Sequence, residues 1–389
     1  MAGLIIRPRA RLFHGHDWVY NTEVMKVFGA PQDGEVISLK DKRDRMLGSA
    51  IYNSRSQIIA RRFSHRRQDL DRDFFVRRIR QAVEHRDRHG LTREARRLVW
   101  SESDGVPGLI LDQYGKHLVI QTVTAAMDQR LPVIVEAICE VLDPASIIER
   151  NDGSGRKAEG LETRNGLLFG ESPGAFQIEM AGLQFELDLL QAQKTGFYLD
   201  QIENYQRIAP YAAGRRVLDC FTNQGAFALA CAKAGAASVS AVESSGPALA
   251  SAAKNAALNQ VEVEWIEANV FDHLTALEKS GAESDLIILD PPSFTRSRSR
   301  VNEALRGYKE IHLRAIKLLT KGGLLATYCC SHHIDWSLFN EMLVSAAVDA
   351  KRTLRRLEVH TQTLDHPVIA GLPETEYLKG GLFELVPSR

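Results

Sequence analysis

The second half of the chain alternates regularly between apolar runs and helical segments, and this pattern constrains the fold most strongly. The runs begin near Val217, Val239, Val261, Leu286 and Leu324. The first four starts are 22, 22 and 25 residues apart, and Ala-rich or amphipathic segments lie between them. Strands that alternate with helices in this way are typical of a parallel sheet covered by helices on both faces. We therefore predict an α/β fold with a doubly wound, mostly parallel sheet.

The first half of the chain has a different pattern. Residues 1–70 contain short apolar runs separated by turn residues, which predicts a small β-barrel; the runs are Leu4–Ile6, Glu35–Leu39, Gly48–Tyr52 and Gln57–Arg62. Residues 71–89 change to helical spacing and carry many arginines. The stretch after residue 97 mixes a predicted hairpin with a helix over Leu131–Leu142. We therefore expect a barrel over 1–70, a central α+β domain over 71–185 and the doubly wound domain over 186–389.

Charge is distributed unevenly along the chain. The 49 Lys and Arg residues balance the 49 Asp and Glu residues overall. Residues 1–100 nevertheless hold 22 basic and 12 acidic residues, which leaves 27 basic and 37 acidic residues in the remainder. Such asymmetry can mark a nucleic-acid interaction surface, although salt bridging across an internal interface would also produce it.

Cysteine usage and hydropathy indicate the compartment. The five cysteines are scattered, form no CxxC pair and include the adjacent Cys329 and Cys330. Free thiols of this kind are typical of a reducing cytoplasm rather than a secreted disulfide scaffold. The amino-terminal segment has no apolar core followed by a cleavage site, and no uncharged apolar run approaches the ~18 residues of a membrane span. We expect a cytoplasmic protein without a membrane partner.

Acidic and amide side chains follow the predicted strands of the doubly wound sheet. Asp219 ends the first strand, Glu243 the second and Asp290 the fourth, while Asn269 follows the third. Ligands of such sheets bind outside the carboxyl ends of the strands, where an acidic side chain can accept the ribose hydroxyls. The first loop contains Gly225, but it matches neither GxGxxG nor a P-loop, so phosphate binding is poorly supported. An adenosine ligand without phosphates indicates S-adenosylmethionine.

Several segments together resemble the PUA-domain class I methyltransferases that modify cytosine C5 in 23S ribosomal RNA. The resemblance extends over nearly the whole chain. The segments that carry it are Gly15–Tyr20, Tyr52–Ser56, Pro107–Tyr114, Glu149–Arg150, Glu159–Leu161, Gln193–Gln201, Cys330–His333, Asp365–Pro367 and Pro373–Gly380. It implies a PUA-like RNA-binding barrel at the amino terminus and a Rossmann-like class I methyltransferase domain at the carboxyl terminus.

The resemblance also implies a set of cofactor-binding residues for S-adenosylmethionine. These are Lys194, Gln201, Asp219, Phe221, Gly225, Glu243, Asn269 and Asp290. Lys194 would neutralise the methionine carboxylate and Gln201 would hydrogen-bond it, the alternative being an exposed lysine and a helix-start glutamine. The sequence departs from the family pattern at Asn223 and Gln224, where the family has aromatic and Thr residues.

Cytosine C5 is too weak a nucleophile to attack a methyl sulfonium directly, so the family resemblance implies covalent catalysis by a cysteine thiolate. Cys330 occupies the family's motif position at the end of the predicted fifth strand, and we predict it to be the nucleophile. Cys329 would point to the opposite face of the strand. Asp290 is predicted to hydrogen-bond the cytosine amino group or N3. The alternative is that both thiols are small buried hydrophobes and Asp290 a strand-end cap.

RNA contacts are expected from the basic front of the chain, because phosphate neutralisation needs Arg and Lys. The predicted contacts are Arg61, Arg62, Arg66 and Arg67. A base that is flipped out of its stack must also be held, and Phe294 is a candidate to stack on it, although a core aromatic would suit the position equally.

The leading hypothesis is thus an enzyme that forms 5-methylcytosine in large-subunit ribosomal RNA. Two alternatives remain open at this stage. A ribosomal RNA guanine-N methyltransferase would use Asp290 to orient an exocyclic amine and would need no cysteine. A non-catalytic RNA-binding or ribosome assembly factor would keep the fold without binding the cofactor. We predict no metal site, and the sequence leaves a homodimer open.

Overall fold

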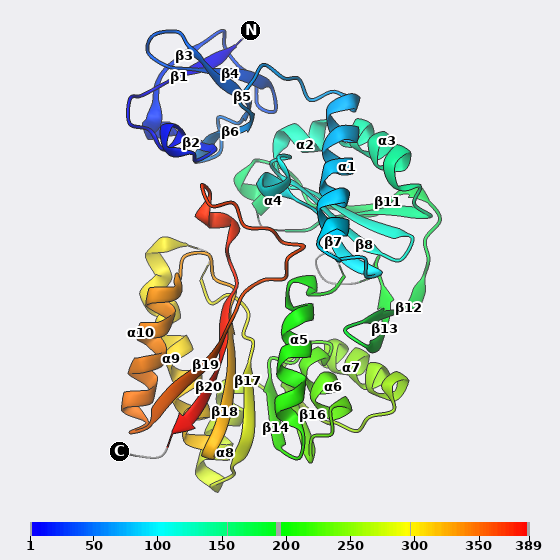
Figure 1. The fold of residues 1–389 in the computed structure, drawn as a ribbon, viewed down its shortest axis with the longest axis vertical. Coiled ribbons are helices and arrows are strands. Elements are labelled where there is room, and N and C mark those ends of the chain that lie inside the picture. Colours follow the sequence, from blue (N-terminus) through cyan, green and yellow to red (C-terminus); the bar gives the residue numbers. More distant parts are fainter. Residues whose placement is uncertain (1, 154, 192–195, 296, 387–389) are drawn as a thin grey trace. The chain divides into compact units, whose positions relative to one another are not determined.

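The structure is a computed structural model that describes residues 2–153, 155–191, 196–295 and 297–386 (Figure 1). The chain divides into two units. Unit 1 comprises residues up to Ile178 with two later segments, Leu187–Leu199 and Leu364–Thr375. Unit 2 comprises the remaining segments, which are Glu179–Glu186, Asp200–Thr363 and Glu376 onward. The finer division at residues 70 and 185 stays a prediction.

A six-stranded barrel opens unit 1. Its strand order is β2-β6-β5-β4-β1-β3, and only the β1–β4 pair is parallel among its strand pairs. Four of the strands confirm the predicted apolar runs. β2 and β3 were not predicted, because β2 has three residues and β3 buries none of its side chains fully. The bounds are β1 Gly3–Ile6, β2 Trp18–Tyr20, β3 Val24–Phe28, β4 Val36–Lys40, β5 Met46–Tyr52 and β6 Ile58–Ser64.

The central part of unit 1 is a five-stranded sheet in the order β11-β10-β9-β8-β7 with helices packed against it. The predicted hairpin is confirmed as β8 and β9, and the predicted helix as α3. The segment between β10 and β11 contains the short helix α4. The bounds are α1 Arg72–Arg88, β7 Ala95–Trp100, β8 Leu109–Tyr114, β9 His117–Thr122, α2 Ala125–Gln129, α3 Leu131–Leu142, β10 Ser146–Asn151, α4 Gly155–Ala158 and β11 Arg164–Gly170.

The barrel and the central sheet share one hydrophobic core within unit 1. Ile51 and Phe63 of the barrel belong to the same cluster of buried side chains as Phe74 and Phe75 of α1. Phe63 and Phe74 meet edge to face, with ring centroids 5.3 Å apart. Asp71 begins α1 by accepting a hydrogen bond from the Phe74 backbone N–H at 2.8 Å, which satisfies one of the free donors of the first turn. The cap therefore fixes where the aromatic face of α1 meets the barrel.

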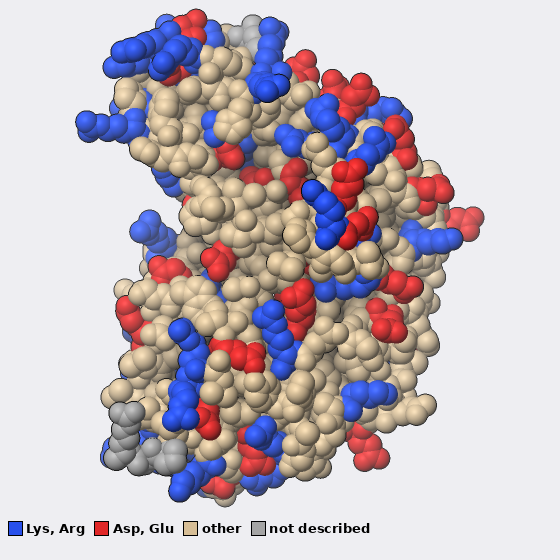
Figure 2. All heavy atoms as spheres, viewed as in Figure 1, with Lys and Arg blue, Asp and Glu red and all other residues tan. Residues whose placement is uncertain are grey.

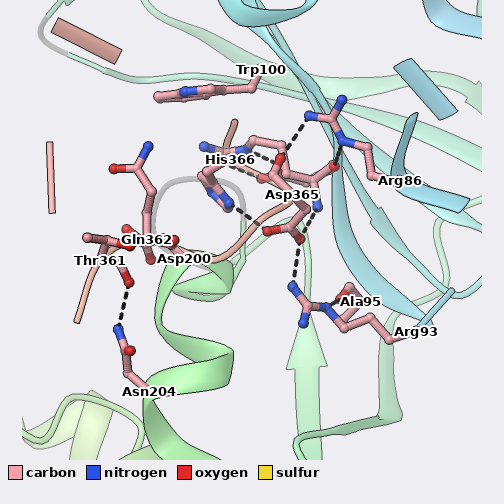
Figure 3. A network of polar contacts seen from close by, with 12 residues as sticks. Arg86, Arg93, Ala95, Trp100, Asp200, Asn204, Thr361, Gln362, Asp365 and His366 are labelled. Carbon is pink, nitrogen blue, oxygen red and sulfur yellow. Dashed lines mark hydrogen bonds and ion pairs between the residues drawn. The ribbon is translucent and has the colours of Figure 1, made fainter. Parts of the chain in front are cut away.

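The segment Leu364–Thr375 of unit 1 is held by a buried carboxylate (Figure 3). Asp365 is fully buried and accepts hydrogen bonds from Arg93 Nη2 at 2.9 Å and from the Arg97 backbone N–H at 3.0 Å. Its other oxygen lies 2.8 Å from His366 Nδ1. Both carboxylate oxygens are thus engaged, which is what a carboxylate removed from water requires.

Arg86 completes this network from α1. Its guanidinium is fully buried and forms a bidentate pair with Asp104, at 2.5 and 2.8 Å. Arg86 also donates to the backbone carbonyl of Asp365 at 2.8 Å, and the rings of His366 and Trp100 lie 5.5 Å apart. The segment Asp365–Pro367, identified above through a family resemblance, therefore stabilises unit 1.

Unit 2 is built on a seven-stranded sheet in the order β16-β15-β14-β17-β18-β20-β19. The first five strands are parallel, and β20 runs antiparallel to both of its neighbours. The bounds are β14 Arg216–Cys220, β15 Ser238–Glu243, β16 Glu264–Glu267, β17 Ser284–Leu289, β18 Leu319–Cys329, β19 Thr353–His360 and β20 Lys379–Val386. β12 (Ala175–Met180) and β13 (Leu183–Asp188) form a separate two-stranded sheet where the chain passes between the units.

Helices cover both faces of the seven-stranded sheet, which confirms the doubly wound prediction. Figure 1 shows α5, α6 and α7 on one face and α8, α9 and α10 on the other. The second group packs into the main core cluster of unit 2 through residues such as Tyr308, Ile311 and Phe339. The bounds are α5 Ile202–Ile208, α6 Ala226–Lys233, α7 Gly246–Asn259, α8 Val270–Ser280, α9 Val301–Leu318 and α10 Trp336–Asp349.

Candidate functional site

The carboxyl ends of the parallel strands of unit 2 meet at one edge of the sheet, and most of the predicted site residues lie there. Phe221 follows β14, Glu243 ends β15, Asn269 lies two residues after β16, Asp290 follows β17 and Cys330 follows β18. Because parallel strands end on the same side, the topology brings these five residues to a common edge. Lys194, a further predicted cofactor ligand, lies outside the described residues.

Asp219 organises the loop that leaves β14. Its Oδ2 accepts hydrogen bonds from Thr222 Oγ1 at 2.5 Å and from the Ala228 backbone N–H at 3.1 Å. Its Oδ1 is buried and has no hydrogen-bond partner among the described residues. Burial raises the pKa of Asp219 to about 7, even though both hydrogen bonds favour the charged form. A half-satisfied buried carboxylate at this edge is the kind of group that a polar ligand completes.

The same loop has an unusual backbone. Phe221, Asn223 and Gly225 have φ values of 64°, 50° and 85°, so three residues of five lie in the left-handed region. A Cβ on Gly225 would lie 2.7 Å from the Trp265 ring, so the close approach that requires glycine comes from a side chain of β16. Left-handed non-glycine residues persist only when their surroundings hold them, and they cluster at binding sites.

Glu243 ties this loop to the end of β15. Its Oε2 accepts the Asn223 backbone N–H at 3.1 Å, and its Oε1 accepts the backbone N–H groups of Ser244 and Ser245 at 2.8 and 3.1 Å. Asn269 caps α8 by accepting the Phe271 backbone N–H at 2.9 Å. The Nδ2 group of Asn269 has no hydrogen-bond partner among the described residues, and the side chain is exposed. An exposed amide donor of this kind can still bind an acceptor of a ligand.

Gln201 holds the Asp290 side chain through a hydrogen bond within unit 2. Gln201 is buried and donates from Nε2 to Asp290 Oδ2 at 3.0 Å. Its Oε1 accepts from Asn204 Nδ2 at 2.6 Å. Both polar ends of Gln201 are thus engaged within the protein, so the structure places it as a support for Asp290. The predicted contact of Gln201 with a methionine carboxylate stays a prediction.

Cys330 lies beside the Asp290 loop. Its Sγ is 4.0 Å from the carbonyl oxygen of Pro291, and the residue is partly exposed. Cys329 is fully buried and belongs to the main core cluster, as the alternation of strand faces predicts. Ser331 joins the two loops, because its Oγ lies 2.8 Å from Ser293 Oγ. The candidate nucleophile and the candidate base-orienting carboxylate are therefore carried by segments that are bonded to one another.

Cys330 differs from the other cysteines in its surroundings. Cys220 and Cys231 are buried in unit 2, and burial raises the pKa of both thiols. Cys139 is partly exposed on α3 of unit 1, and burial raises the pKa of its thiol as well. Among the described residues of unit 2, Cys330 is therefore the cysteine that is partly exposed, while the others are buried.

Sequence reasoning missed one charged residue of this site. Lys379 is buried at the start of β20 and pairs in register with Cys329. Its Nζ donates to the carbonyl oxygens of Ser331 and Tyr377, at 2.9 and 2.7 Å. No carboxylate lies within ion-pair distance of this ammonium among the described residues. Burial lowers the pKa of Lys379, while the thiols of Cys329 and Cys330 oppose that shift. In the sequence, Lys379 stood out only as part of the segment Pro373–Gly380, which carries the family resemblance. That resemblance assigned no role to Lys379.

Phe294 sits in an aromatic cluster. Its ring centroid is 4.4 Å from that of Tyr308, 5.9 Å from Phe271 and 6.4 Å from Phe221. Tyr308 in turn places its hydroxyl 3.0 Å from Ser331 Oγ. The ring is partly buried, so stacking on a base stays a prediction for Phe294.

The four arginines predicted to contact RNA divide into two pairs. Arg61 pairs with Glu102 at 2.6 Å and Arg62 with Asp17 at 2.7 Å, and their side chains are only 17% and 7% exposed. Arg66 and Arg67 are exposed. The structure therefore places the first pair in the architecture of unit 1 and leaves the second pair accessible to a partner.

Comparisons with known proteins decide the family. Residues 162–374 match the S-adenosylmethionine-dependent methyltransferases, and residues 7–65 match a PUA-like domain. The chain belongs to the S-adenosylmethionine-dependent methyltransferase family. A relative from Vibrio vulnificus, named ribosomal RNA large subunit methyltransferase I, is 39% identical over 375 residues, which cover 94% of each chain.

Two solved structures share the fold of this methyltransferase. One is described as a SAM-dependent methyltransferase from Streptococcus mutans, with a TM-score of 0.85 and 22% identity over 99% of this chain and 100% of that one. The other is a methyltransferase complexed with S-adenosylhomocysteine, with a TM-score of 0.87 and 21% identity over the same shares of the two chains.

The edge residues fit S-adenosylmethionine as the cofactor of the family. Asp219 presents an unpaired buried oxygen, and Asn269 presents an exposed amide donor. Glu243 lies at the end of the second strand, where a ribose would bind. The described residues contain no group of three His, Cys, Asp or Glu side chains placed to hold a metal ion. Every helix in the described part of the chain is too short or too polar to traverse a lipid bilayer.

Proposed function

We propose that this methyltransferase forms 5-methylcytosine in large-subunit ribosomal RNA, with Cys330 as the nucleophile. The position of the Cys330 thiol beside the Asp290 loop carries this proposal. The relatives named ribosomal RNA large subunit methyltransferase I support the substrate class. The cytosine and its C5 position rest on the chemistry of the site, because attack by a thiolate is needed for carbon C5 and not for an exocyclic nitrogen.

The proposed reaction proceeds through a covalent adduct between Cys330 and the cytosine. The Cys330 thiolate adds to cytosine C6, a C–S bond forms, and the electron pair of the C5–C6 double bond makes C5 nucleophilic. When bound, S-adenosylmethionine would supply the electrophilic methyl group: the new C5–methyl bond would form as the methyl–sulfonium bond breaks, with S-adenosylhomocysteine as the leaving group. A base removes the C5 proton, the C5–C6 double bond re-forms, and the C–S bond breaks to release the Cys330 thiolate.

Asp290 and Lys379 support this chemistry from two sides. The Asp290 carboxylate can accept a hydrogen bond from the cytosine N4 amino group, and this donor distinguishes cytosine from uracil. Gln201 holds that carboxylate in place through its 3.0 Å hydrogen bond. Lys379 contributes a buried positive charge next to Ser331, and a positive charge near a thiol lowers its pKa and favours the thiolate.

Mapping of 5-methylcytosine at nucleotide resolution tests the proposal. Ribosomal RNA from a deletion strain is compared with RNA from strains complemented by the parent, Cys330→Ala or Cys139→Ala, the latter being the matched control for a partly exposed cysteine. We expect one large-subunit site to disappear in the deletion strain and to return with the parent and Cys139→Ala only. Purified Cys330→Ala should still bind S-adenosylmethionine. Restoration of the site by Cys330→Ala, or an unchanged map in the deletion strain, would contradict the proposal.

A further inference from the structure

Asn204 is a buried residue of α5 to which the proposed reaction gives no role. Its Nδ2 group donates two hydrogen bonds, to Gln201 Oε1 at 2.6 Å and to the Thr361 backbone carbonyl at 3.1 Å. Its Oδ1 atom is buried and has no hydrogen-bond partner among the described residues. An acceptor that is buried without a partner costs stability, so the surroundings must hold this amide in its orientation.

The Thr361 carbonyl fixes the orientation of Asn204, because a backbone carbonyl oxygen can only accept. Thr361 follows β19, and Figure 3 shows the Asn204 amide directed at it. The same stretch of backbone is tied to the start of α5, since the Thr363 N–H donates to the Asp200 carbonyl at 3.1 Å. An amide oxygen in place of Nδ2 would face the Thr361 carbonyl as one acceptor facing another. The Nδ2 group therefore lies there, and Oδ1 is left on the other side.

The orientation of Asn204 in turn fixes that of Gln201. Because Asn204 presents an N–H group, the atom of Gln201 that faces it must be the acceptor Oε1. The opposite atom is then Nε2, which donates to Asp290 Oδ2 at 3.0 Å. Gln201 is itself buried, so a reversed amide would lose both bonds without water to replace them. The Thr361 carbonyl thereby determines that Asp290 meets a donor.

We infer that Asn204 is a positioning residue which, through Gln201, keeps Asp290 a hydrogen-bond acceptor for the amino group of the target base. An N–H group that donates to a carboxylate favours its ionised form, and an ionised carboxylate only accepts. A Gln201 amide in the reverse orientation would favour the protonated acid, which donates. The inference rests on the role proposed for Asp290. It adds that two neutral amides help to select a base with an amino group over a base with a carbonyl group.

Other groups around Asp290 also act on its charge. Neighbouring elements carry Asp219 in β14, Tyr328 in β18, Cys330 after β18, Lys379 in β20, Arg207 in α5 and Glu358 in β19. Tyr328 interacts electrostatically with Asp290. On the face drawn in Figure 2, Lys and Arg side chains are interspersed with Asp and Glu over unit 2, and salt screens such exposed charges over about 10 Å. All these groups stay in place when Asn204 is replaced, so a comparison with the parent isolates the two amides.

The pH dependence of methyl transfer to ribosomal RNA tests the inference, with tritiated S-adenosylmethionine as the methyl donor so that methylation of any base is counted. Asn204→Leu donates no hydrogen bond, so the two orientations of Gln201 come closer in energy and Asp290 keeps a proton to higher pH. The ratio of variant to parent kcat/KM should therefore be about fivefold below one at acidic pH and recover as the pH rises. The titration of Cys330 cancels in this ratio.

The matched control is Asn259→Leu. Asn259 is also a buried asparagine of unit 2 that donates to two backbone carbonyls, those of Gln184 and Asn255. Its replacement should give a ratio that does not vary with pH, as expected for a residue that only stabilises the fold. If Asn204→Leu does not fold, Asn204→Ala provides the same test, because alanine also donates no hydrogen bond from its side chain.

A double-mutant cycle tests the path through Gln201. Gln201→Met removes the donor to Asp290 and should show the same pH dependence, and Asn204→Leu added to it should change that dependence no further. A ratio independent of pH in Asn204→Leu, or effects of the two variants that simply add, would overturn the inference. A pH-dependent ratio with a product other than 5-methylcytosine would contradict the proposed function and uphold the inference, because a guanine amino group also donates to a carboxylate.

Discussion

Two regions of the molecule bury charged groups in opposite ways. In unit 1, Arg86, Asp104 and Asp365 lie almost without exposure, and each finds a partner of opposite charge or a hydrogen-bond donor. At the sheet edge of unit 2, Asp219 keeps an unpaired oxygen and Lys379 is bound to backbone carbonyls instead of a carboxylate. Both regions bury charged groups away from water. Only in the unit 1 network does the protein itself supply the partners that these groups need.

The difference separates residues that stabilise the fold from residues that a ligand or a reaction uses. A buried pair that satisfies all its donors and acceptors resists change, and removal of one partner leaves an uncompensated charge. A buried group that is only partly satisfied is expensive to keep, so it persists where a ligand or a reaction uses it. We therefore expect mutations in the unit 1 network to change stability, and mutations at the sheet edge to change pH dependence, thiol chemistry and cofactor binding.

The largest expected effect on stability is at Asp104. Asp104→Asn removes the counter-charge of the fully buried Arg86, and we expect the free energy of unfolding of the protein to fall by about 3–5 kcal/mol. Urea unfolding of the parent and of the variant measures this change in the free energy of unfolding. Glu303→Gln is the control, because the Arg300–Glu303 pair is exposed to solvent and should contribute little to stability. Equal losses in the two variants would remove the contrast between the regions.

Asp219 gives the next effect, which depends on pH. The folded protein holds the pKa of this carboxyl at about 7, above its ordinary value of 3.8, so the folded state binds the proton more tightly. Its contribution to stability is therefore complete below about pH 4 and is lost as the pH rises to about 7, with a slope of up to ~1.4 kcal/mol per pH unit.

Thermal unfolding of the parent and of Asp219→Asn between pH 4 and pH 8 measures this slope. The amide has no proton to lose in this range, so the variant should show a flatter curve than the parent. Parallel curves would show that Asp219 does not titrate in the folded protein and would contradict the account of its burial.

Lys379 should affect the thiol. Lys379→Gln removes a positive charge that interacts with Cys330, so iodoacetamide should alkylate Cys330 more slowly at neutral pH and the rate should reach its half-maximum at a higher pH. The measurement uses a Cys139→Ser background. Lys233→Gln is the control, because Lys233 also donates to a backbone carbonyl, that of Asn259. An unshifted pH profile in Lys379→Gln would leave Lys379 as a structural residue only.

A further expected effect is at Gly225. Gly225→Ala places a Cβ 2.7 Å from the Trp265 ring at φ 85°, so we expect a loss of about 1–3 kcal/mol and weaker S-adenosylmethionine binding. Gly235→Ala is the matched control, since Gly235 has φ 86° and open space around it. The difference between the two melting temperatures isolates the collision from the backbone strain. Full cofactor affinity in Gly225→Ala would show that the loop geometry is irrelevant to binding.

The edge of the sheet was predictable from the sequence because local patterns define it. Asp219, Glu243, Asp290 and Cys330 each follow or end an apolar run, and parallel strands bring such positions together. The doubly wound architecture followed from the same spacing. These are features in which a side chain's place depends mainly on its own strand.

Other features depend on contacts that no local pattern contains. Asp365 meets Arg93 across 272 residues of sequence, and Gln201 meets Asp290 across 89. Lys379 reaches the site through its register opposite Cys329 on an antiparallel strand. Arg61 and Arg62 belonged to a basic cluster in the sequence, yet both are paired with acids in the folded chain. A pairing partner decides whether a charge is available, and the sequence does not show the partner.

The most direct test of the central claim is to trap the covalent intermediate. Large-subunit ribosomal RNA transcribed with 5-fluorocytidine is incubated with the protein and S-adenosylmethionine, then digested and analysed by mass spectrometry. Fluorine at C5 cannot be removed as a proton, so the last step stops and the C–S bond stays intact. We predict a peptide containing Cys330 linked through sulfur to a methylated fluorocytosine. Methyl transfer to a guanine nitrogen without any cysteine-linked nucleotide would contradict the account.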